Sequence, residues 1–374
     1  MMLYNLLTSL PMMVCAFFTV LILLGWNDSR LREQRTLFGY MLSATLLYAG
    51  HYVFFNHVTN LLPLMDTIYV TTNLAVYPLY LIYIIRLTSP WKSSYGWLLL
   101  PAIIGGVATC IGFLLLSPQD CQQFVEHYLY HNQTAGLTGT ALWLAWTHII
   151  CKVVFAIEVI VTVVVGYRLI RNYHRQVNEL YADTDDKSMR TIQTILLLVL
   201  IASTLSFVAN IIGRYRFTDS FWLLLFPSAA FSALLFSIGH AGLQRRFSFK
   251  DLGHDRNALL EEMEKPVDTL SDLPLTERII TIVEREKIFL QPNLKLDDLA
   301  RLMNTNRTYI YQAINQQMGV SFNELINRRR IRHAQLLMTE KPELSVNEVA
   351  TQSGFSSLSS FYRNLKKYKE QAIQ

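Results

Sequence analysis

Long apolar runs fill the chain up to about Leu243, and amphipathic patterns with dense charge replace them afterwards. A helix that crosses a bilayer needs roughly 20 mostly apolar residues. Seven runs reach that length, so the pattern predicts an all-α protein that begins with a bundle of seven transmembrane helices. The runs are Leu3–Trp26, Thr36–Phe55, Asp66–Leu87, Tyr95–Leu116, Ala141–Ile170, Thr191–Gly213 and Ser220–Leu243.

The loops between these runs alternate in their content of Lys and Arg. The first, third and fifth loops and the segment after the last run are basic, whereas the second and fourth loops hold neither residue type. Basic loops remain on the cytoplasmic side of a membrane. We therefore expect the N-terminus outside and the C-terminus in the cytoplasm, although the sixth loop, with Arg214 and Arg216, departs from the alternation.

Polar residues within the runs are candidates for a ligand pocket. His148, Lys152 and Glu158 lie in the fifth run, and Asn73 lies in the third. Ionisable groups are costly in lipid and usually face a bundle interior or a cavity. The functional interpretation is a small-molecule site or polar relay, and the structural one, which we favour, is pairing between helices.

Motifs of enzymes and metal sites do not stand out. Three of the four cysteines lie in apolar runs, and none has metal-ligand spacing. A metal-dependent intramembrane enzyme would need a His-Glu-x-x-His motif or paired carboxylates on facing helices. We therefore expect no catalytic residues, no metal and no cofactor. A transporter or channel would predict internal repeats, and none is obvious.

The charge of the chain is concentrated at its C-terminal end. Apolar residues make up 52% of the chain and charged residues 16%, against about 25% charged residues in a typical soluble domain. Residues 273–374 hold 15 Lys and Arg against 10 Asp and Glu, which accounts for the whole net charge of +5. A basic excess of this size suits a polyanion partner, and it also suits an ordinary solvated surface.

An acidic stretch separates the two halves. Asp251–Asp272 contains seven acidic residues and two basic ones. We interpret it as a polar linker, with a short dimerising or coupling helix as the alternative. The predicted domains are therefore residues 1–243 as a transmembrane sensor, 244–273 as the linker and 274–374 as a separate helical domain.

The last hundred residues predict the same pair of helices twice. The first comprises a helix over Asp297–Met303, a break, and a second helix over Asn306–Met318 that Gly319 stops. The second begins with the capping box Ser345–Glu348 and continues through the turn at Gly354 to a helix that Ser357 caps. A basic helix, Phe322–Met338, joins the two helix pairs. A short turn between two helices is the geometry that seats the second helix in the major groove of DNA.

These residues resemble the AraC/XylS family of bacterial transcription activators. The similarity covers about the last hundred residues, and the chain departs from the family's usual ending from Tyr368 onward. It implies a double helix-turn-helix fold that binds double-stranded DNA. Together with the seven apolar runs and the basic loops, it predicts a multi-pass protein of the bacterial cytoplasmic membrane. The motifs are Asp298–Ile310, Gly319–Phe322, Asn327–Ala334, Val349–Ala350, Gly354–Ser356 and Phe361–Lys367.

The resemblance also implies which side chains would contact DNA. Gln312 could pair with adenine and Thr308 could touch a thymine methyl, while Arg363 is the best candidate to read guanine. Lys366, Lys367 and Arg307 would bind phosphates. We expect the DNA-contacting residues on exposed helix faces. The full set is Arg307, Thr308, Tyr311, Gln312 and Asn315 in the first helix pair and Ser359, Tyr362, Arg363, Lys366 and Lys367 in the second helix pair.

The sequence thus predicts a membrane-embedded transcription regulator that couples a membrane or periplasmic signal to promoter binding. Its expected partners are DNA and the lipid bilayer, with a small-molecule ligand and a second copy of the chain left open. The alternative is a membrane transporter or receptor whose helix-turn-helix tail serves as a regulatory interaction module.

Overall fold

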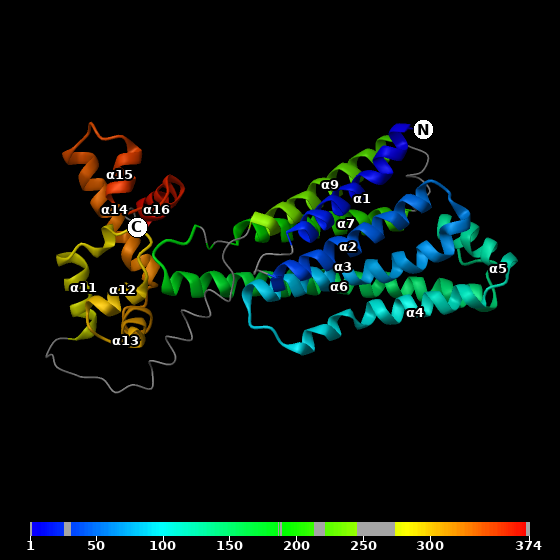
Figure 1. The fold of residues 1–374 in the computed structure, drawn as a ribbon, viewed down its shortest axis with the longest axis horizontal. Helices are drawn as coiled ribbons and strands as arrows, with labels where there is room; N and C mark the ends of the chain where they lie inside the picture. Colours follow the sequence, from blue (N-terminus) through cyan, green and yellow to red (C-terminus); the bar gives the residue numbers. More distant parts are fainter. Residues whose placement is uncertain are drawn as a thin grey trace. The chain divides into compact units, whose positions relative to one another are not determined.

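The computed structural model describes residues 2–25, 31–185, 187, 189–212, 221–244 and 274–371. These residues form helices and connecting segments without a strand, apart from one isolated antiparallel bridge between Tyr181 and Lys295 (Figure 1). The all-α prediction is therefore confirmed. The acidic linker, except for Gln244, and the loop with Arg214 and Arg216 lie outside the described residues.

The chain divides into two compact units, and each unit is built from two separate stretches of the sequence. The first unit comprises Met1–Ile170 and Met189–Arg245, and the second comprises Arg171–Ser188 and Arg246–Gln374. The stretch Arg171–Ser188, which we call the inserted segment, thus folds with the C-terminal residues. It includes the last turns of the helix that begins at Gly139.

The first unit is built from long apolar helices. Five helical segments of the described chain are long and apolar enough to cross a membrane. The other two predicted runs form the helices α2 and α7 without meeting that criterion, so the count of seven spans stays a prediction. The five segments are Leu3–Leu24, Thr59–Thr88, Ser93–Leu115, Gly139–Leu180 and Leu224–Gln244. The α-helices that contribute to the unit are α1 (Met2–Leu24), α2 (Leu31–Phe55), α3 (Leu62–Thr88), α4 (Leu100–Leu115), α5 (Pro118–Gln123), α6 (Gly139–Leu180), α7 (Arg190–Ile212) and α9 (Phe221–Gln244).

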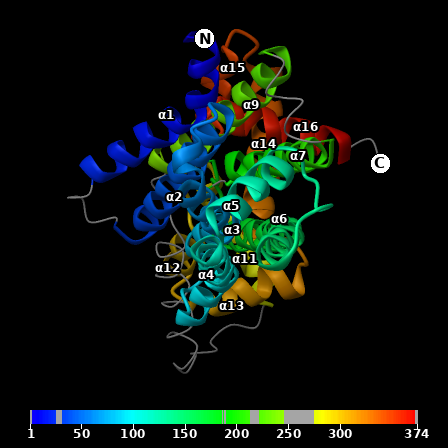
Figure 2. The same cartoon turned by 90° about the vertical axis from the view of Figure 1, so that its right-hand side faces the viewer.

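Small residues let helices of the first unit approach closely. In Figures 1 and 2, α1 lies beside α2 and α9, and α3 packs between α2 and α4. A Cβ atom added at Gly239 would lie 2.4 Å from the ring of Phe18, and one at Gly106 would lie 2.1 Å from the hydroxyl of Thr71. Close packing at small residues is the usual way that transmembrane helices associate.

The second unit contains the two predicted helix pairs and the helix that joins them. Its helices are α11 (Leu275–Arg285), α12 (Leu296–Leu302), α13 (Arg307–Gln312), α14 (Phe322–Glu340), α15 (Val346–Gln352) and α16 (Leu358–Gln371). α13 ends earlier than predicted and continues as a π-helical turn over Ala313–Gln317.

Local signals explain where these helices begin. The side chain of Asn306 accepts a hydrogen bond of 2.8 Å from the amide of Thr308 at the start of α13. Ser345 and Glu348 form the predicted capping box at the start of α15. Such caps satisfy amides that have no partner within the helix. The predicted helix starts are therefore confirmed.

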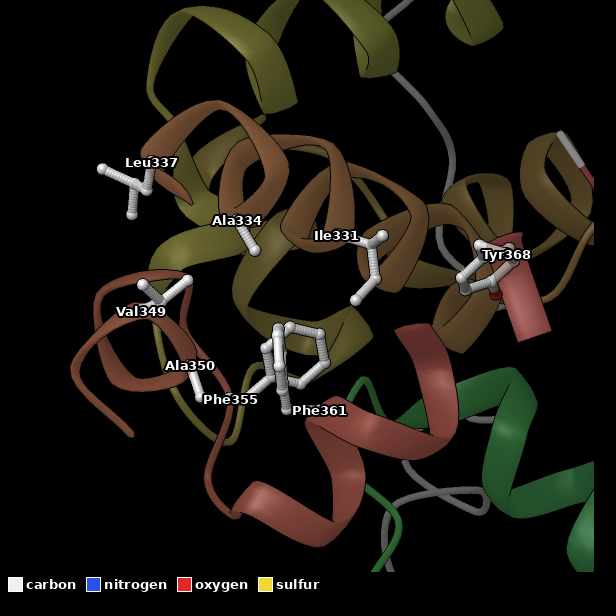
Figure 3. Close-up of a cluster of buried hydrophobic side chains, with 8 residues drawn as sticks. All are labelled: Ile331, Ala334, Leu337, Val349, Ala350, Phe355, Phe361 and Tyr368. Atoms are coloured by element: carbon white, nitrogen blue, oxygen red, sulfur yellow. The ribbon is translucent and has the colours of Figure 1, made fainter. Parts of the chain in front are cut away.

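The second helix pair packs on α14 through one apolar cluster (Figure 3). The rings of Phe355 and Phe361 meet edge to face with centroids 5.5 Å apart. Tyr368, where the chain departs from the usual family ending, is buried in the same cluster at 9% exposure. α16 therefore stays attached to the domain through its own aromatic residues. The cluster comprises Ile331, Ala334, Leu337, Val349, Ala350, Phe355, Phe361 and Tyr368.

Candidate nucleic-acid interface

The predicted contact residues of α16 share one side of that helix. Ser359, Tyr362, Lys366 and Lys367 are all exposed, and Tyr362 has 54% of its surface accessible. Their spacing of three, four and one residues places them along one helical face. Arg363 lies on the same stretch with 34% of its side chain exposed. α16 therefore presents an aromatic and basic face of the kind that contacts DNA.

The predicted contact residues of α13 and of the π-helical turn that follows it differ in exposure. Tyr311, Gln312 and Asn315 are half-buried, and the amide of Asn315 donates to the carbonyl of Tyr311 at 3.1 Å. Arg307 and Thr308 are buried, with exposures of 8% and 5%, so the expectation of an exposed position was wrong for these two.

Arg307 has a structural contact that explains its burial. Its Nη1 atom lies 2.6 Å from the Oδ1 atom of Asp297, which stands on α12. This ion pair ties the two helices of the first pair together. The predicted phosphate contact of Arg307 stays a prediction.

An acidic residue from the inserted segment contacts the predicted guanine reader. The Nη1 atom of Arg363 lies 2.6 Å from the Oδ1 atom of Asp185. The hydroxyl of Ser357 donates to the Oδ2 atom of the same carboxylate, also at 2.6 Å. Ser357 at the same time accepts a hydrogen bond of 3.1 Å from the amide of Ser360. Asp185 thus lies at the N-terminal end of α16, where a negative charge is favourable.

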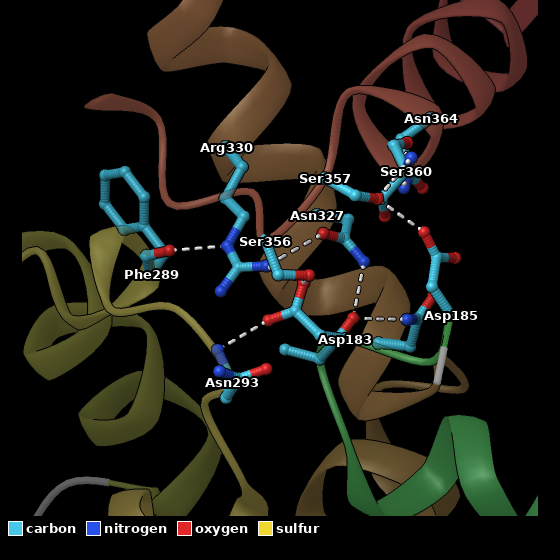
Figure 4. Close-up of polar contacts among 12 residues, drawn as sticks. Asp183, Asp185, Phe289, Asn293, Asn327, Arg330, Ser356, Ser357, Ser360 and Asn364 are labelled. Atoms are coloured by element: carbon cyan, nitrogen blue, oxygen red, sulfur yellow. Dashed lines mark hydrogen bonds and ion pairs between the residues drawn. The ribbon is translucent and has the colours of Figure 1, made fainter. Parts of the chain in front are cut away.

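A second acid of the inserted segment is buried against α14 (Figure 4). Asp183 forms an ion pair of 2.9 Å with Arg330 of α14, and their side chains are 3% and 0% exposed. Asp183 also accepts hydrogen bonds from the amide of Asn293 at 2.8 Å and the hydroxyl of Ser356 at 3.3 Å. A buried charge needs such partners because desolvation is expensive.

Arg330 is held by backbone acceptors as well as by Asp183. It donates to the carbonyl oxygens of Phe289 at 2.6 Å and Gln291 at 2.7 Å. Burial lowers the pKa of Arg330 from its ordinary value, and the carboxylate of Asp183 opposes that shift. An arginine always keeps its charge in proteins, so Asp183 neutralises a permanent buried cation.

Backbone contacts fix the inserted segment between these two acids. The carbonyl of Ala182 accepts hydrogen bonds from the side-chain amides of Asn323 at 2.6 Å and Asn327 at 3.0 Å. The amide of Ala182 donates to the carbonyl of Leu294 at 3.0 Å. The segment is therefore an integral part of the second unit.

The inserted segment also contacts the first helix pair. The hydroxyl of Tyr311 donates to the Oε2 atom of Glu179 at 3.0 Å. Glu179 stands on the last turn of α6. Sequence reasoning missed the whole segment, because it considered only the basic residues of this loop. The acids at 179, 183 and 185 were the available signal.

Two of the candidate ligand residues have partners in the first unit. The Nε2 atom of His148 lies 2.6 Å from the Oδ2 atom of Asp66. Lys152 donates to the Oδ1 atom of Asn132 at 2.9 Å and lies over the ring of Tyr128. The contact between His148 and Asp66 joins α6 to α3, as the pairing interpretation expects.

The remaining two candidates carry no assigned role. Both carboxylate oxygens of Glu158 are buried without a hydrogen-bond partner among the described residues. Asn73 is half-buried on α3. Their part in ligand binding stays a prediction.

Comparison with known proteins yields similarity at the C-terminal end. Residues 299–373 match the helix-turn-helix domain family. The Msm operon regulatory protein of Streptococcus mutans is 32% identical over 76 residues, which are 20% of this chain and 27% of that protein. An uncharacterized HTH-type transcriptional regulator of Staphylococcus aureus strain COL is 26% identical over 95 residues, or 25% of this chain and 13% of that protein. The chain thus covers about an eighth to a quarter of these relatives, and no solved structure matches it.

Proposed function

From the premise that its C-terminal region is an AraC-type helix-turn-helix domain, we propose that this protein is a membrane-embedded, sequence-specific DNA-binding transcription regulator. The names of the relatives, an operon regulatory protein and an HTH-type transcriptional regulator, support this role. The observation that carries it is the presence of two capped helix pairs, α12–α13 and α15–α16, joined by α14.

The second helix of each pair, α13 or α16, would contact DNA with its own set of residues. α16 would read bases with Arg363 and Tyr362 and bind phosphates with Lys366 and Lys367, with Ser359 beside them. α13 would contribute Tyr311 and Gln312 to base contacts, and the π-helical turn that follows it would contribute Asn315. Arginine reads guanine and glutamine reads adenine through paired hydrogen bonds in the major groove, whereas lysine contacts with phosphates set the position of the protein on DNA.

The apolar helices support a location in the bacterial cytoplasmic membrane. Five helical segments among the described residues could cross it, and the alternation of basic loops favours a cytoplasmic C-terminus. In this proposal residues 1–243 sense a signal, residues 244–273 link, and residues 274–374 bind DNA. A small molecule near Glu158 and Asn73 and a second copy of the chain are candidate partners.

Chromatin mapping in the native host tests the proposal on the full-length protein. Precipitation of the chain should enrich discrete promoter fragments. A variant with Lys366→Ala and Lys367→Ala should lose that enrichment while still fractionating with membranes. A matched variant, Lys341→Ala and Lys287→Ala, changes the same charge outside α13 and α16 and should keep it. Absence of enrichment for the unchanged chain at every promoter would contradict DNA binding and leave the transporter alternative.

A further inference from the structure

We propose that the inserted segment is an acidic inhibitor of the DNA-binding surface, which must leave that surface before DNA can bind. This inference rests on the proposed function, because it concerns the regulation of the same site. It starts from the observation that two acids of one segment contact one predicted base-reading residue on each of α13 and α16.

At α16 the carboxylate of Asp185 occupies the place that a DNA phosphate would favour. It binds the guanidinium of Arg363 and the hydroxyl of Ser357, each at 2.6 Å. Helix N-termini attract phosphates because their free amides and the helix dipole favour negative charge. While Asp185 is bound, Arg363 points its charge at the protein's own carboxylate and is withheld from a guanine.

At α13 the contact is of the same kind. The hydroxyl of Tyr311 donates to the carboxylate of Glu179 at 3.0 Å. Two acids six residues apart therefore engage both helix pairs at once. The stretch from Glu179 to Lys187 carries four acidic residues and one basic residue, and so its charge is opposite to that of the basic domain it contacts.

Asp183, which lies between Glu179 and Asp185 in the sequence, anchors the inserted segment to the second unit. Its ion pair with Arg330 is closed to solvent, and Ala182 is fixed by three hydrogen bonds to the second unit. An unanchored acidic loop would exchange freely with DNA phosphates. The anchor makes the covered state a defined conformation that a signal can displace.

The chain connects this inhibitor directly to a candidate membrane span. Glu179 lies on the last turn of α6, and α6 is one continuous helix from Gly139. A rotation or shift of that helix in response to a signal would move Glu179 and the residues that follow it. The signal would thus reach the DNA-binding surface through the inserted segment without needing the linker at 244–273.

DNA affinity measured on the full chain in lipid nanodiscs tests the inhibition. The probe is the duplex most enriched in the chromatin mapping. We expect Asp185→Asn to bind it roughly fivefold more tightly than the unchanged chain, the size expected of one partly exposed ion pair. The double variant Glu179→Gln and Asp185→Asn should gain more. Glu343→Gln, which removes an exposed charge from the loop between α14 and α15, should change affinity little.

Equal affinities for the unchanged chain, Asp185→Asn and Glu343→Gln would overturn the inhibition while leaving DNA binding intact. Failure of every variant to bind any duplex would instead overturn the proposed function, and this inference with it. The two failures are therefore distinguishable.

Amide hydrogen exchange gives a second readout that needs no variant. In the free protein the amide of Ala182 is protected by its bond to Leu294. Saturating DNA should accelerate exchange in peptides covering residues 178–185, because the segment leaves the surface that DNA then covers. Unchanged protection of those peptides in the DNA complex would mean that the segment remains docked, which would refute the proposal.

Discussion

Asp183 and Arg330 lie 147 residues apart in the chain and form a 2.9 Å ion pair that is almost closed to solvent. One partner comes from the loop between α6 and α7, and the other from the helix that joins the two helix pairs. A charge pair at this depth is costly to break because either charge alone would be buried without compensation. The pair therefore makes the loop a structural part of the C-terminal domain.

Replacing Asp183 by Ala should strongly destabilise the second unit. Removing one partner of a buried ion pair costs about 3–5 kcal/mol, and the backbone carbonyls that bind Arg330 place the expected loss near the lower value. All six Trp residues lie between Trp26 and Trp222, outside the second unit. Pulse proteolysis of the full chain, with cleavage followed within residues 274–371, would therefore measure the loss better than Trp fluorescence.

The ion pair between Arg329 and Glu284 is the matched control for that experiment. Its Nε–Oε1 distance is 2.8 Å, but the side chain of Glu284 is 51% exposed. Exposed pairs contribute at most about 1 kcal/mol, so Glu284→Ala should be nearly neutral. Equal losses for the two variants would show that burial does not determine the strength of the Asp183 contact.

Replacing Gly354 by Ala should disrupt the turn between α15 and α16. Gly354 has a φ of +84°, and an added Cβ would lie 2.7 Å from the carbonyl oxygens of Phe289 and Leu290. Left-handed backbone costs a residue with a side chain about 1–2 kcal/mol, and a clash with backbone atoms adds to that. We expect a loss well above 2 kcal/mol in denaturant unfolding followed by amide exchange.

Gly319 separates these two contributions. Its φ is +68°, and nothing lies within 4 Å of an added Cβ. Gly319→Ala should therefore lose only the conformational part, about 1–2 kcal/mol. A loss at Gly354 no larger than at Gly319 would mean that the turn relaxes away from Phe289 without cost.

These local features were predictable from the sequence, and the long-range ones were not. The capping residues Asn306 and Ser345 act on amides two or three positions away, so their sequence context suffices to locate them. Arg307 was expected to be exposed, because nothing near it in sequence indicates that Asp297 would pair with it. The fifth apolar run was predicted to end at Ile170, and the helix that contains it, α6, continues to Leu180.

The inserted segment shows why the candidate site was only half predictable. Its polar residues resemble a solvated loop when they are read in sequence, and the partners of Asp183 and Asp185 lie 147 and 178 residues away. Hydrophobic periodicity carries no information on such polar contacts. The recognition helices could be predicted from their own residues. The acids at 179, 183 and 185 are visible in the sequence, but nothing in it indicates which residues they contact.

The capping box of α15 should make the second helix pair sensitive to acid. The amide and hydroxyl of Ser345 bind the carboxylate of Glu348 at 2.8 and 2.7 Å, and these hydrogen bonds lower the pKa of Glu348. A lowered pKa in the folded state stabilises the protein above the unfolded value, about 4.3, and that contribution disappears as the pH falls through the folded value. Exchange at the amides of α15 should therefore accelerate as the pH falls below about 4, after correction for intrinsic rates.

Glu348→Gln should remove that pH dependence. The control variant Glu343→Gln, at an exposed position, should behave like the unchanged chain. Ser345→Ala should reduce the pH dependence without abolishing it, because it removes the hydroxyl that the carboxylate binds and leaves the backbone amide bond of residue 345 in place. An identical pH profile in all four proteins would exclude the capping box as the acid-sensitive element.

Substitutions at Gln312 and Lys366 should affect DNA binding in different ways. Gln312→Ala should cost about 1–3 kcal/mol on the preferred duplex and relax the choice of base at one position, since a side chain that reads a base discriminates. Lys366→Ala should weaken binding to all duplexes about equally and reduce the salt slope by about 1, since one fewer phosphate contact releases one fewer counterion. Titration of preferred and scrambled duplexes at several salt concentrations measures both effects. If Gln312→Ala altered the salt slope and left base preference intact, the assignment of α13 to base reading would be wrong.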